Sequence, residues 1–450
     1  MASQFRDQRD KMLNMPLGPL ILKLSVPTVL SMLVSGVYNL GDTFFVGQLG
    51  TSASGAVGIV FSYMAILQAF GFMCGQGSGA LAAQKLGAGR KEEASVIGST
   101  GFLIDFVIGA ILEVLTLLFL SPLARLLGST DTIQPYAEDY MFWIAIAAPF
   151  LTTSLLLNNI LRYEGYASLA MIGLMSGGLL NLAGDPLFMF VFGMGISGAG
   201  LSTALSQIVS FFILLSMFLR GRTQTKLSLK NVSLKASVVA QILMVGFPSL
   251  TRQGLSSVST MLLNRSTRVY GDAAVAGMSI VGRITMLTFT VVIGIGQGFQ
   301  PVSAYNFGAG KYTRLRKAYH LTILFQETML VIFVSICFAF SNSLIGVFRD
   351  DPEVIAIGTP ALRYALAAQL TQAFVVATNM LYQSTGRAAG ATFLSMLRSG
   401  FVFIPVLLIM RSALGLFGIQ IAQPVSDVIS CVLTIPFAVR YFRVYWEDEA

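Results

Sequence analysis

Long apolar stretches alternate with short polar connections along almost the whole chain. From Leu17 to Phe442, apolar runs of roughly 20 or more residues recur, each long enough to cross the hydrocarbon core of a bilayer. The runs are continuous, so they predict helices and not the short alternating strands of a barrel. Hydropathy and turn residues place twelve spans, at residues 17–48, 52–84, 92–120, 133–160, 168–192, 197–220, 237–269, 274–306, 315–342, 354–383, 390–411 and 415–441.

Composition strengthens this prediction of an all-α integral membrane protein. Hydrophobic residues make up 55% of the chain and charged residues 11%, whereas a soluble domain carries about 25% charged residues. The net charge of +8 first suggests a nucleic-acid partner. However, most of the 29 basic residues fall in connections on one side of the predicted membrane. This is the positive-inside pattern, which predicts both termini in the cytoplasm, a multi-pass protein in the plasma (inner) membrane, and no nucleic-acid partner.

The chain contains an internal repeat. Gly75-Gln76-Gly77 recurs as Gly296-Gln297-Gly298, and Gly87-Ala88-Gly89 recurs as Gly308-Ala309-Gly310, both at an offset of 221 residues. Since each half holds an even number of spans, the halves are parallel repeats, an arrangement found among transporters. We therefore predict an N-lobe (1–220), a cytoplasmic linker loop (221–236) and a C-lobe (237–450) around a central cleft, in a protein that works as a monomer.

Ionisable residues inside membrane spans are candidate functional residues because each is costly to bury. Asp42 and Asp185 lie at a similar depth in the outer half of the first lobe, with Asn181 one helical turn from Asp185 and Thr203 at the same level. Such oxygen atoms suit a proton or Na⁺, and two carboxylates in a low dielectric favour taking up a cation. The alternative is that the carboxylates pair with arginines or cap the break at Pro186.

The repeat predicts that this candidate site occurs in the first half only. The residues that correspond to Asp42, Asn181 and Asp185 in the second half carry no charge; they are Leu263, Val402 and Val406.

Other candidates are weaker. Asp427 and Arg283 lie at similar depths and are expected either to form a structural ion pair or to line the cleft, and Arg398 is a candidate for its inner end. Asp105, Glu113 and Glu327 either line a cavity or pair locally. A soft, partly aromatic substrate lining is expected from residues that are otherwise ordinary packing: Tyr38, Met64, Met278, Met286, Gln297, Tyr305 and Tyr382.

Enzyme chemistry and resident cofactors are not expected. His320 is the only histidine, and the three cysteines have no metal-ligand spacing, so neither a catalytic triad nor a metal cluster is predicted. The only metal expected is a transported Na⁺ at the candidate site, with H⁺ as the other coupling ion.

Two motifs resemble a known family. Residues Asn39-Leu40-Gly41-Asp42-Thr43-Phe44-Phe45-Val46-Gly47 are similar to the first-helix motif of MATE (multidrug and toxic compound extrusion) transporters. Asn181 through Asp185-Pro186-Leu187-Phe188, followed by Gly195-Ile196-Ser197-Gly198-Ala199-Gly200, resembles the same family. The resemblance implies twelve helices in two lobes around a V-shaped cleft and export coupled to protons or Na⁺. It also implies that Asp42, Asn181, Asp185 and Thr203 form the N-lobe cation site.

The second half indicates the branch of that family. The stretches Arg252–Tyr270 and Asp351–Tyr382 show no membrane-embedded carboxylate of the NorM-like kind. The chain is therefore more similar to the DinF-like and MepA-like bacterial branch.

The sequence thus predicts an antiporter that exports amphiphilic, cationic organic compounds. One alternative is a flippase for a lipid-linked or metabolite substrate, which would require a strongly basic cleft; Arg283, Arg398 and Arg252 are its candidates. A membrane enzyme lacks a nucleophile–base pair here, and a channel lacks any sequence resembling a selectivity filter.

Overall fold

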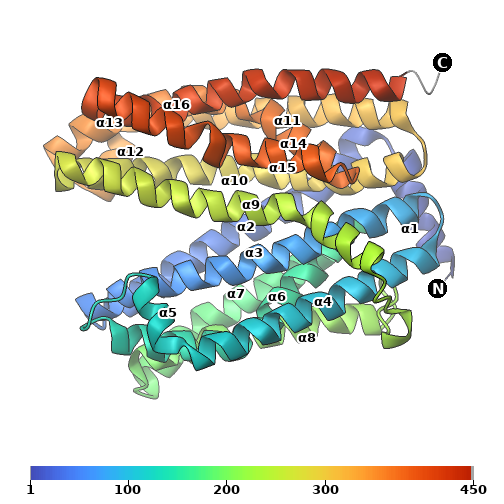
Figure 1. Ribbon diagram of the computed structural model, residues 1–450, viewed down its shortest axis with the longest axis horizontal. Helices are drawn as coiled ribbons and strands as arrows, with labels where there is room; N and C mark the ends of the chain where they lie inside the picture. The colour runs from blue at the N-terminus through green and yellow to red at the C-terminus, as the bar shows by residue number, and fades with distance from the viewer. Residues whose placement is uncertain (1, 447–450) are drawn as a thin grey trace. The chain divides into compact units, whose positions relative to one another are not determined.

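The computed structural model describes the backbone of residues 2–446. It also describes their side chains, except those of residues 2–7, 37–40, 445 and 446. Across this part of the chain the backbone is almost entirely helical, and no strand occurs in it (Figure 1). The predicted all-α class is confirmed.

The helices of the first half follow the predicted spans closely. In chain order they are α1 (Ala2–Asn14), α2 (Leu17–Gly47), α3 (Thr51–Gly87), α4 (Lys91–Leu118), α5 (Leu120–Leu126), α6 (Gln134–Tyr163), α7 (Ala167–Pro186), the π-helical turn η1 (Leu187–Val191) and α8 (Gly195–Leu219).

The second half repeats this order after the short turn η2 (Leu229–Asn231). Its elements are α9 (Ala236–Thr267), η3 (Arg268–Tyr270), α10 (Asp272–Gly308), α11 (Tyr312–Ala339), α12 (Ser341–Phe348), α13 (Pro352–Gln369), α14 (Gln372–Ser384), α15 (Ala388–Met396), the π-helical turn η4 (Leu397–Phe401) and α16 (Phe403–Trp446). Gly415, with φ of 60°, breaks α16 into two helices, as the predicted spans 390–411 and 415–441 require.

Length and hydropathy show which helices are able to cross a membrane. Within the described residues, nine segments meet both criteria, and one of them, Ala388–Val444, is 57 residues long and holds the break at Gly415. The predicted spans 237–269 and 354–383 are helical, but they are not among the nine segments that are both long and apolar enough. The second of these is interrupted between α13 and α14.

The chain forms two compact units that exchange helix segments. One unit contains residues up to 15 and residues 30–250, and the other contains residues 16–29 and residues from 251 onward. The start of α2 therefore packs with the second half, and the start of α9 packs with the first.

The repeated glycines explain how these exchanged segments fit. A Cβ atom on Gly77 of α3 would lie 2.0 Å from the Ile242 carbonyl of α9, and one on Gly298 of α10 would lie 2.2 Å from the Ser25 hydroxyl of α2. These two glycines occupy equivalent positions in the repeat, and each lets two helices cross closely.

The repeat also appears in individual hydrogen bonds. Asn158 donates to the Ala170 carbonyl and Asn379 donates to the Ala391 carbonyl, both at 2.8 Å. Donor and acceptor are related by the same 221-residue offset in each case. The two halves are thus built on one scaffold.

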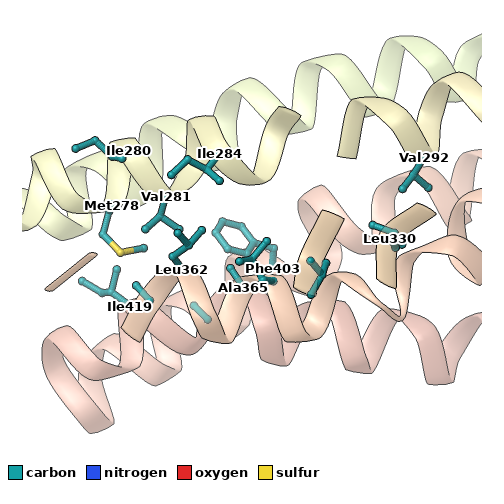
Figure 2. Close-up of a cluster of buried hydrophobic side chains, with 14 of the residues drawn as sticks. Met278, Ile280, Val281, Ile284, Val292, Leu330, Leu362, Ala365, Phe403 and Ile419 are labelled. Atoms are coloured by element: carbon teal, nitrogen blue, oxygen red, sulfur yellow. The ribbon is translucent and has the colours of Figure 1, made fainter. Parts of the chain in front are cut away.

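Each unit has its own core. In the first, α6 packs against α3, α4 and α8, so it occupies the centre of that helix group. In the second, α10, α13 and α16 enclose a cluster that includes Met278, Leu362 and Phe403 (Figure 2).

The linker is anchored to one end of the first unit. The buried Glu164, just beyond α6, accepts hydrogen bonds from the backbone N–H groups of Gln224 and Thr225 at 2.6 and 2.9 Å. Ser95 and Ser99, near the start of α4, bond to the backbone of Lys226 and Ser228. We call this the linker end of the first unit. Burial raises the pKa of Glu164 to about 7, although its hydrogen bonds act in the opposite direction.

Candidate ion-binding site

Four helices of the first unit bring polar side chains together near the end opposite the linker. Asp42 comes from α2, Tyr140 from α6, Asn181 and Asp185 from α7, and Thr203 from α8. All five side chains are buried. Gly184, beside Asp185, allows α7 and α8 to approach, because a Cβ there would lie 2.5 Å from the Ser202 hydroxyl.

A chain of hydrogen bonds connects the two carboxylates. Asn181 donates to Asp185 Oδ1 at 2.9 Å and to Thr203 Oγ1 at 3.1 Å. Tyr140 donates to Asp42 Oδ1 at 2.9 Å and lies 3.3 Å from the Thr203 hydroxyl. Since the single Tyr140 proton is directed at Asp42, Thr203 donates to Tyr140.

Each carboxylate receives too few donors for a buried charge. The Oδ2 atoms of Asp42 and Asp185 are buried and have no hydrogen-bond partner. The ion pairs found among the described residues involve neither side chain. A buried carboxylate that lacks a counter-ion and has one donor carries a large desolvation cost. The two groups are also near enough to repel each other when both are ionised.

This arrangement favours uptake of a cation. A proton on one free Oδ2 removes a charge, and Na⁺ could be held by carboxylate, amide and hydroxyl oxygens, the hard ligands such ions prefer. Either ion removes repulsion between the carboxylates and lowers the cost of burial. The arginine-pairing alternative finds no support in the described residues.

The structure brings together the four residues predicted from depth and helical spacing. It adds Tyr140 and Ser202, which were not predicted; Ser202 donates to the Asn181 carbonyl at 3.1 Å. Tyr140 is 98 positions from Asp42 and lies in an apolar span, where a tyrosine resembles ordinary packing. Ser202 had one local signal, its position next to Thr203. That the group binds an ion, and which ion it binds, stay predictions.

Of the two alternatives for Asp427 and Arg283, the ion pair between them is wrong. Asp427 instead accepts from Arg398 Nε at 3.1 Å and from Gln423 at 2.7 Å, and it is 1% exposed. The Arg398 guanidinium also lies 3.8 Å from the centre of the Phe289 ring. Arg283 is exposed on α10, and depth alone could not show which helix face each residue occupies.

The predicted substrate-lining residues fall into two groups. Met286 is 70% exposed, whereas the others with described side chains are buried. Met64 and Met278 lie in apolar clusters, and the Tyr382 hydroxyl donates to the Phe437 carbonyl at 2.8 Å. The remaining buried members are Gln297 and Tyr305. The side chain of Tyr38 lies outside the described residues.

A family model then decides which group of proteins these features belong to. The MatE model matches residues 27–187 and 248–438, one stretch in each half of the repeat. The chain belongs to the MatE family. Its two matched stretches contain the repeated glycines and both carboxylates of the candidate site.

MatE relatives of this chain are similar along nearly its full length. The multidrug export protein MepA of Staphylococcus saprophyticus is 27% identical over 424 residues, covering 94% of this chain and 93% of the relative. MepA of Staphylococcus aureus strain NCTC 8325 is 26% identical over 405 residues, covering 90% and 89%.

Solved MATE structures share the fold. One, described as MATE in the bent conformation, superposes with a TM-score of 0.92 at 23% identity, covering 99% of this chain and 98% of that one. Another, described as an outward-facing multidrug resistance MATE transporter, gives 0.91 at 24% identity, covering 97% and 98%. Together with the family match, these similarities confirm the predicted MATE membership and the two-lobed helical membrane fold.

Proposed function

We propose that the chain is a secondary active exporter that exchanges amphiphilic, cationic organic compounds for H⁺ or Na⁺. The observation that carries the proposal is the buried Asp42–Asp185 group, in which each carboxylate keeps one oxygen without a partner. Such a group gains stability when it binds a cation and loses it when the cation leaves. The relatives named multidrug export proteins support the substrate class.

Coupling requires that the ion bind two conformations with different affinity. The four helices α2, α6, α7 and α8 meet at the site, so neutralising the carboxylates changes how they pack. With both termini and the linker end in the cytoplasm, the group lies toward the outer side of the membrane. The ion enters from outside, rearranges these helices, and the drug leaves in exchange.

A flippase is the alternative on the same scaffold. The exposed Arg283, within a membrane-spanning helix, is the observation that favours it, because a guanidinium binds phosphate oxygens. Arg398 is paired with Asp427, which removes one of the cations that this alternative needs.

Transport in proteoliposomes tests the proposal. Ethidium efflux is measured under an imposed proton gradient and then under a Na⁺ gradient, for wild type, Asp42→Asn and Asp185→Asn, with Glu113→Gln as a matched control. The proposal predicts efflux under one gradient and its loss in both site variants only. Undiminished gradient-driven efflux in both variants would contradict the proposed site. Movement of a pyrophosphate-linked lipid without ethidium efflux would favour the flippase.

A further inference from the structure

Asp105, in the middle of α4, is a third buried carboxyl in the first unit. It has no exposed surface, and neither of its carboxyl oxygens has a hydrogen-bond partner. Its polar neighbours come from α3 and α6, whereas the Asp42–Asp185 site is built from α2, α6, α7 and α8.

Two glycines allow this part of α4 to lie close to its neighbours. Gly101 and Gly109 lie one helical turn on either side of Asp105, so all three share a face. A Cβ on Gly101 would lie 1.9 Å from the Ser78 hydroxyl of α3, and one on Gly109 would lie 2.6 Å from the Pro149 Cα of α6. Asp105 is therefore enclosed where three helices meet.

Few polar groups lie beside the Asp105 carboxyl. The Cys74 thiol of α3 and the Thr152 hydroxyl of α6 are the polar groups beside it. The Thr152 hydroxyl is directed to backbone carbonyls. The Ser78 hydroxyl, one turn nearer the linker end, is buried and also lacks a partner. A carboxylate cannot stay charged in such a place without a counter-ion, so the side chain is stable there as the neutral acid.

A neutral acid used only for packing normally donates its proton to an acceptor, and this one does not. The fold thus contains a costly group whose polar neighbours are only a thiol and a hydroxyl, and such residues inside membrane helices mark ion pathways by default.

Its depth distinguishes Asp105 from the outer pair. At about 1.5 Å per residue, it lies roughly 20 Å from the end of α4 at Leu118, whereas Asp42 lies roughly 8 Å from the end of α2 at Gly47. Both of those helix ends are at the end opposite the linker. Helix α6 contacts both places, through Tyr140 at Asp42 and Thr152 at Asp105.

We propose that Asp105 is a second proton-binding carboxyl of the first unit, one that takes up and releases a proton in each transport cycle. The inference rests on the proposed antiport function. The proton taken from water on one side is held on the carboxyl while α3, α4 and α6 enclose it, and it returns to water when their contact opens. Because α6 links the two places, its movement at the Asp42–Asp185 group also changes the contact at Asp105.

The test compares Asp105→Asn with wild type and with Glu113→Gln, a partly exposed carboxyl two turns further along α4. Three quantities are measured: ethidium efflux under a proton gradient, ethidium affinity by fluorescence polarisation, and protons released per ethidium bound in weak buffer. Asp105→Asn should reduce efflux at least tenfold and release about one proton fewer, with affinity changed less than about twofold. The Glu113→Gln variant should match wild type in all three.

A second substitution and a spectroscopic measurement keep the proposal open to refutation if Asp105→Asn folds poorly. Asp105→Leu replaces the carboxyl by an apolar group. Infrared spectra of aspartate-labelled Asp42→Asn/Asp185→Asn protein should still show a protonated-carboxyl band that responds to pH, and absence of that band overturns the proposal. Wild-type efflux and proton release in a folded Asp105 variant also overturn it. If Asp42→Asn still loses transport in that case, the proposed function stands and only this inference fails.

Discussion

Around Asp42 and Asp185 the first half of the molecule is polar, and the equivalent region of the second half is apolar. The corresponding residues there are Leu263, Val402 and Val406. Leu263 and Val406 pack against the buried cluster that contains Phe403. Figure 2 shows Phe403 within this cluster. The second half places its buried charge elsewhere, in the Arg398–Asp427 pair, and that charge has a counter-ion. A shared scaffold thus holds unneutralised carboxylates in one half and a paired carboxylate in the other.

The largest expected effect comes from removing the unneutralised pair. Asp42→Asn and Asp185→Asn should each reduce gradient-driven ethidium efflux about 100-fold or more, and the double variant should be no worse than either single one. Residues that act as one unit are not additive. As a control in the second half, Val406→Ala should lower stability while leaving ion dependence intact. Additive losses in the double variant would contradict a single shared site.

Removing the counter-ion pair of the second half should act on stability. Asp427→Asn leaves Arg398, whose side chain is 21% exposed, without its partner and should cost about 3 kcal/mol, read as a lower thermal midpoint in detergent. Replacing both residues, as Arg398→Met with Asp427→Leu, should recover much of that loss. A single variant as stable as wild type would show that the pair is not structural.

The linker between the two halves is held by Glu164 of the first half. The raised pKa of this residue predicts that the stability of the linker contact depends on pH. The Glu164 carboxyl binds a proton more tightly in the folded protein than in the unfolded chain, since folding raises its pKa from 4.5 to about 7. Its stabilising contribution is therefore full below about pH 4.5 and is lost as pH rises through about 7, a change of about 3 kcal/mol. Hydrogen exchange of residues 222–228 should accelerate over this range beyond the intrinsic rate.

The matched variants for this pH effect are Glu164→Gln and Glu92→Gln. The first removes the titrating group and should abolish the extra pH dependence, although it also loses one acceptor for a linker N–H. The second removes an exposed carboxylate of α4 and should behave as wild type. The same pH response in Glu164→Gln would assign the effect to another group.

The scaffold itself should respond equally in both halves. Gly77→Ala and Gly298→Ala each place a methyl group against a crossing helix and should each cost about 1–3 kcal/mol. Thermal midpoints measured side by side check this, with Gly254→Ala, where a Cβ meets no neighbour, as the control. A large effect in one half alone would mean that the two crossings are not equivalent.

Among the site variants, the smallest effect on transport is expected for Tyr140→Phe, which removes one donor to Asp42 and leaves the rest of the group in place. A hydrogen bond to a charged group contributes about 1.5–3 kcal/mol, so efflux at a limiting gradient should fall about tenfold. The Tyr63→Phe variant, another buried tyrosine of the same unit, should change efflux much less. Equal losses in the two variants would argue against a specific role for Tyr140.

Most of the fold could be predicted from the sequence, because hydropathy and glycine punctuation are local signals. The predicted spans end within a few residues of the helices, and Gly415, which breaks α16, is the first residue of the last predicted span. The break between α13 and α14 was not predicted, since no proline or glycine marks Leu370 and Thr371.

The candidate site was only partly predictable. Asn181 and Asp185 lie one turn apart on a single helix, so their contact follows from spacing. Asp42 and Thr203 could be placed by counting residues from a turn. Tyr140 and the partner of Asp427 could not, because counting gives depth but not the face of a helix that a side chain occupies. Arg398 reaches Asp427 from the π-helical turn Leu397–Phe401, whose departure from α-helical geometry also changes the direction of its side chains.

Ion binding without any substrate tests the contrast between the halves most directly. Purified wild type, Asp42→Asn and Asp427→Asn are compared for ²²Na⁺ binding at equilibrium and for protons taken up when the pH is lowered. We predict that wild type binds one of these ions with the Asp42–Asp185 group, that Asp427→Asn keeps that binding, and that Asp42→Asn loses it. Loss of the ion in Asp427→Asn with retention in Asp42→Asn would contradict the account.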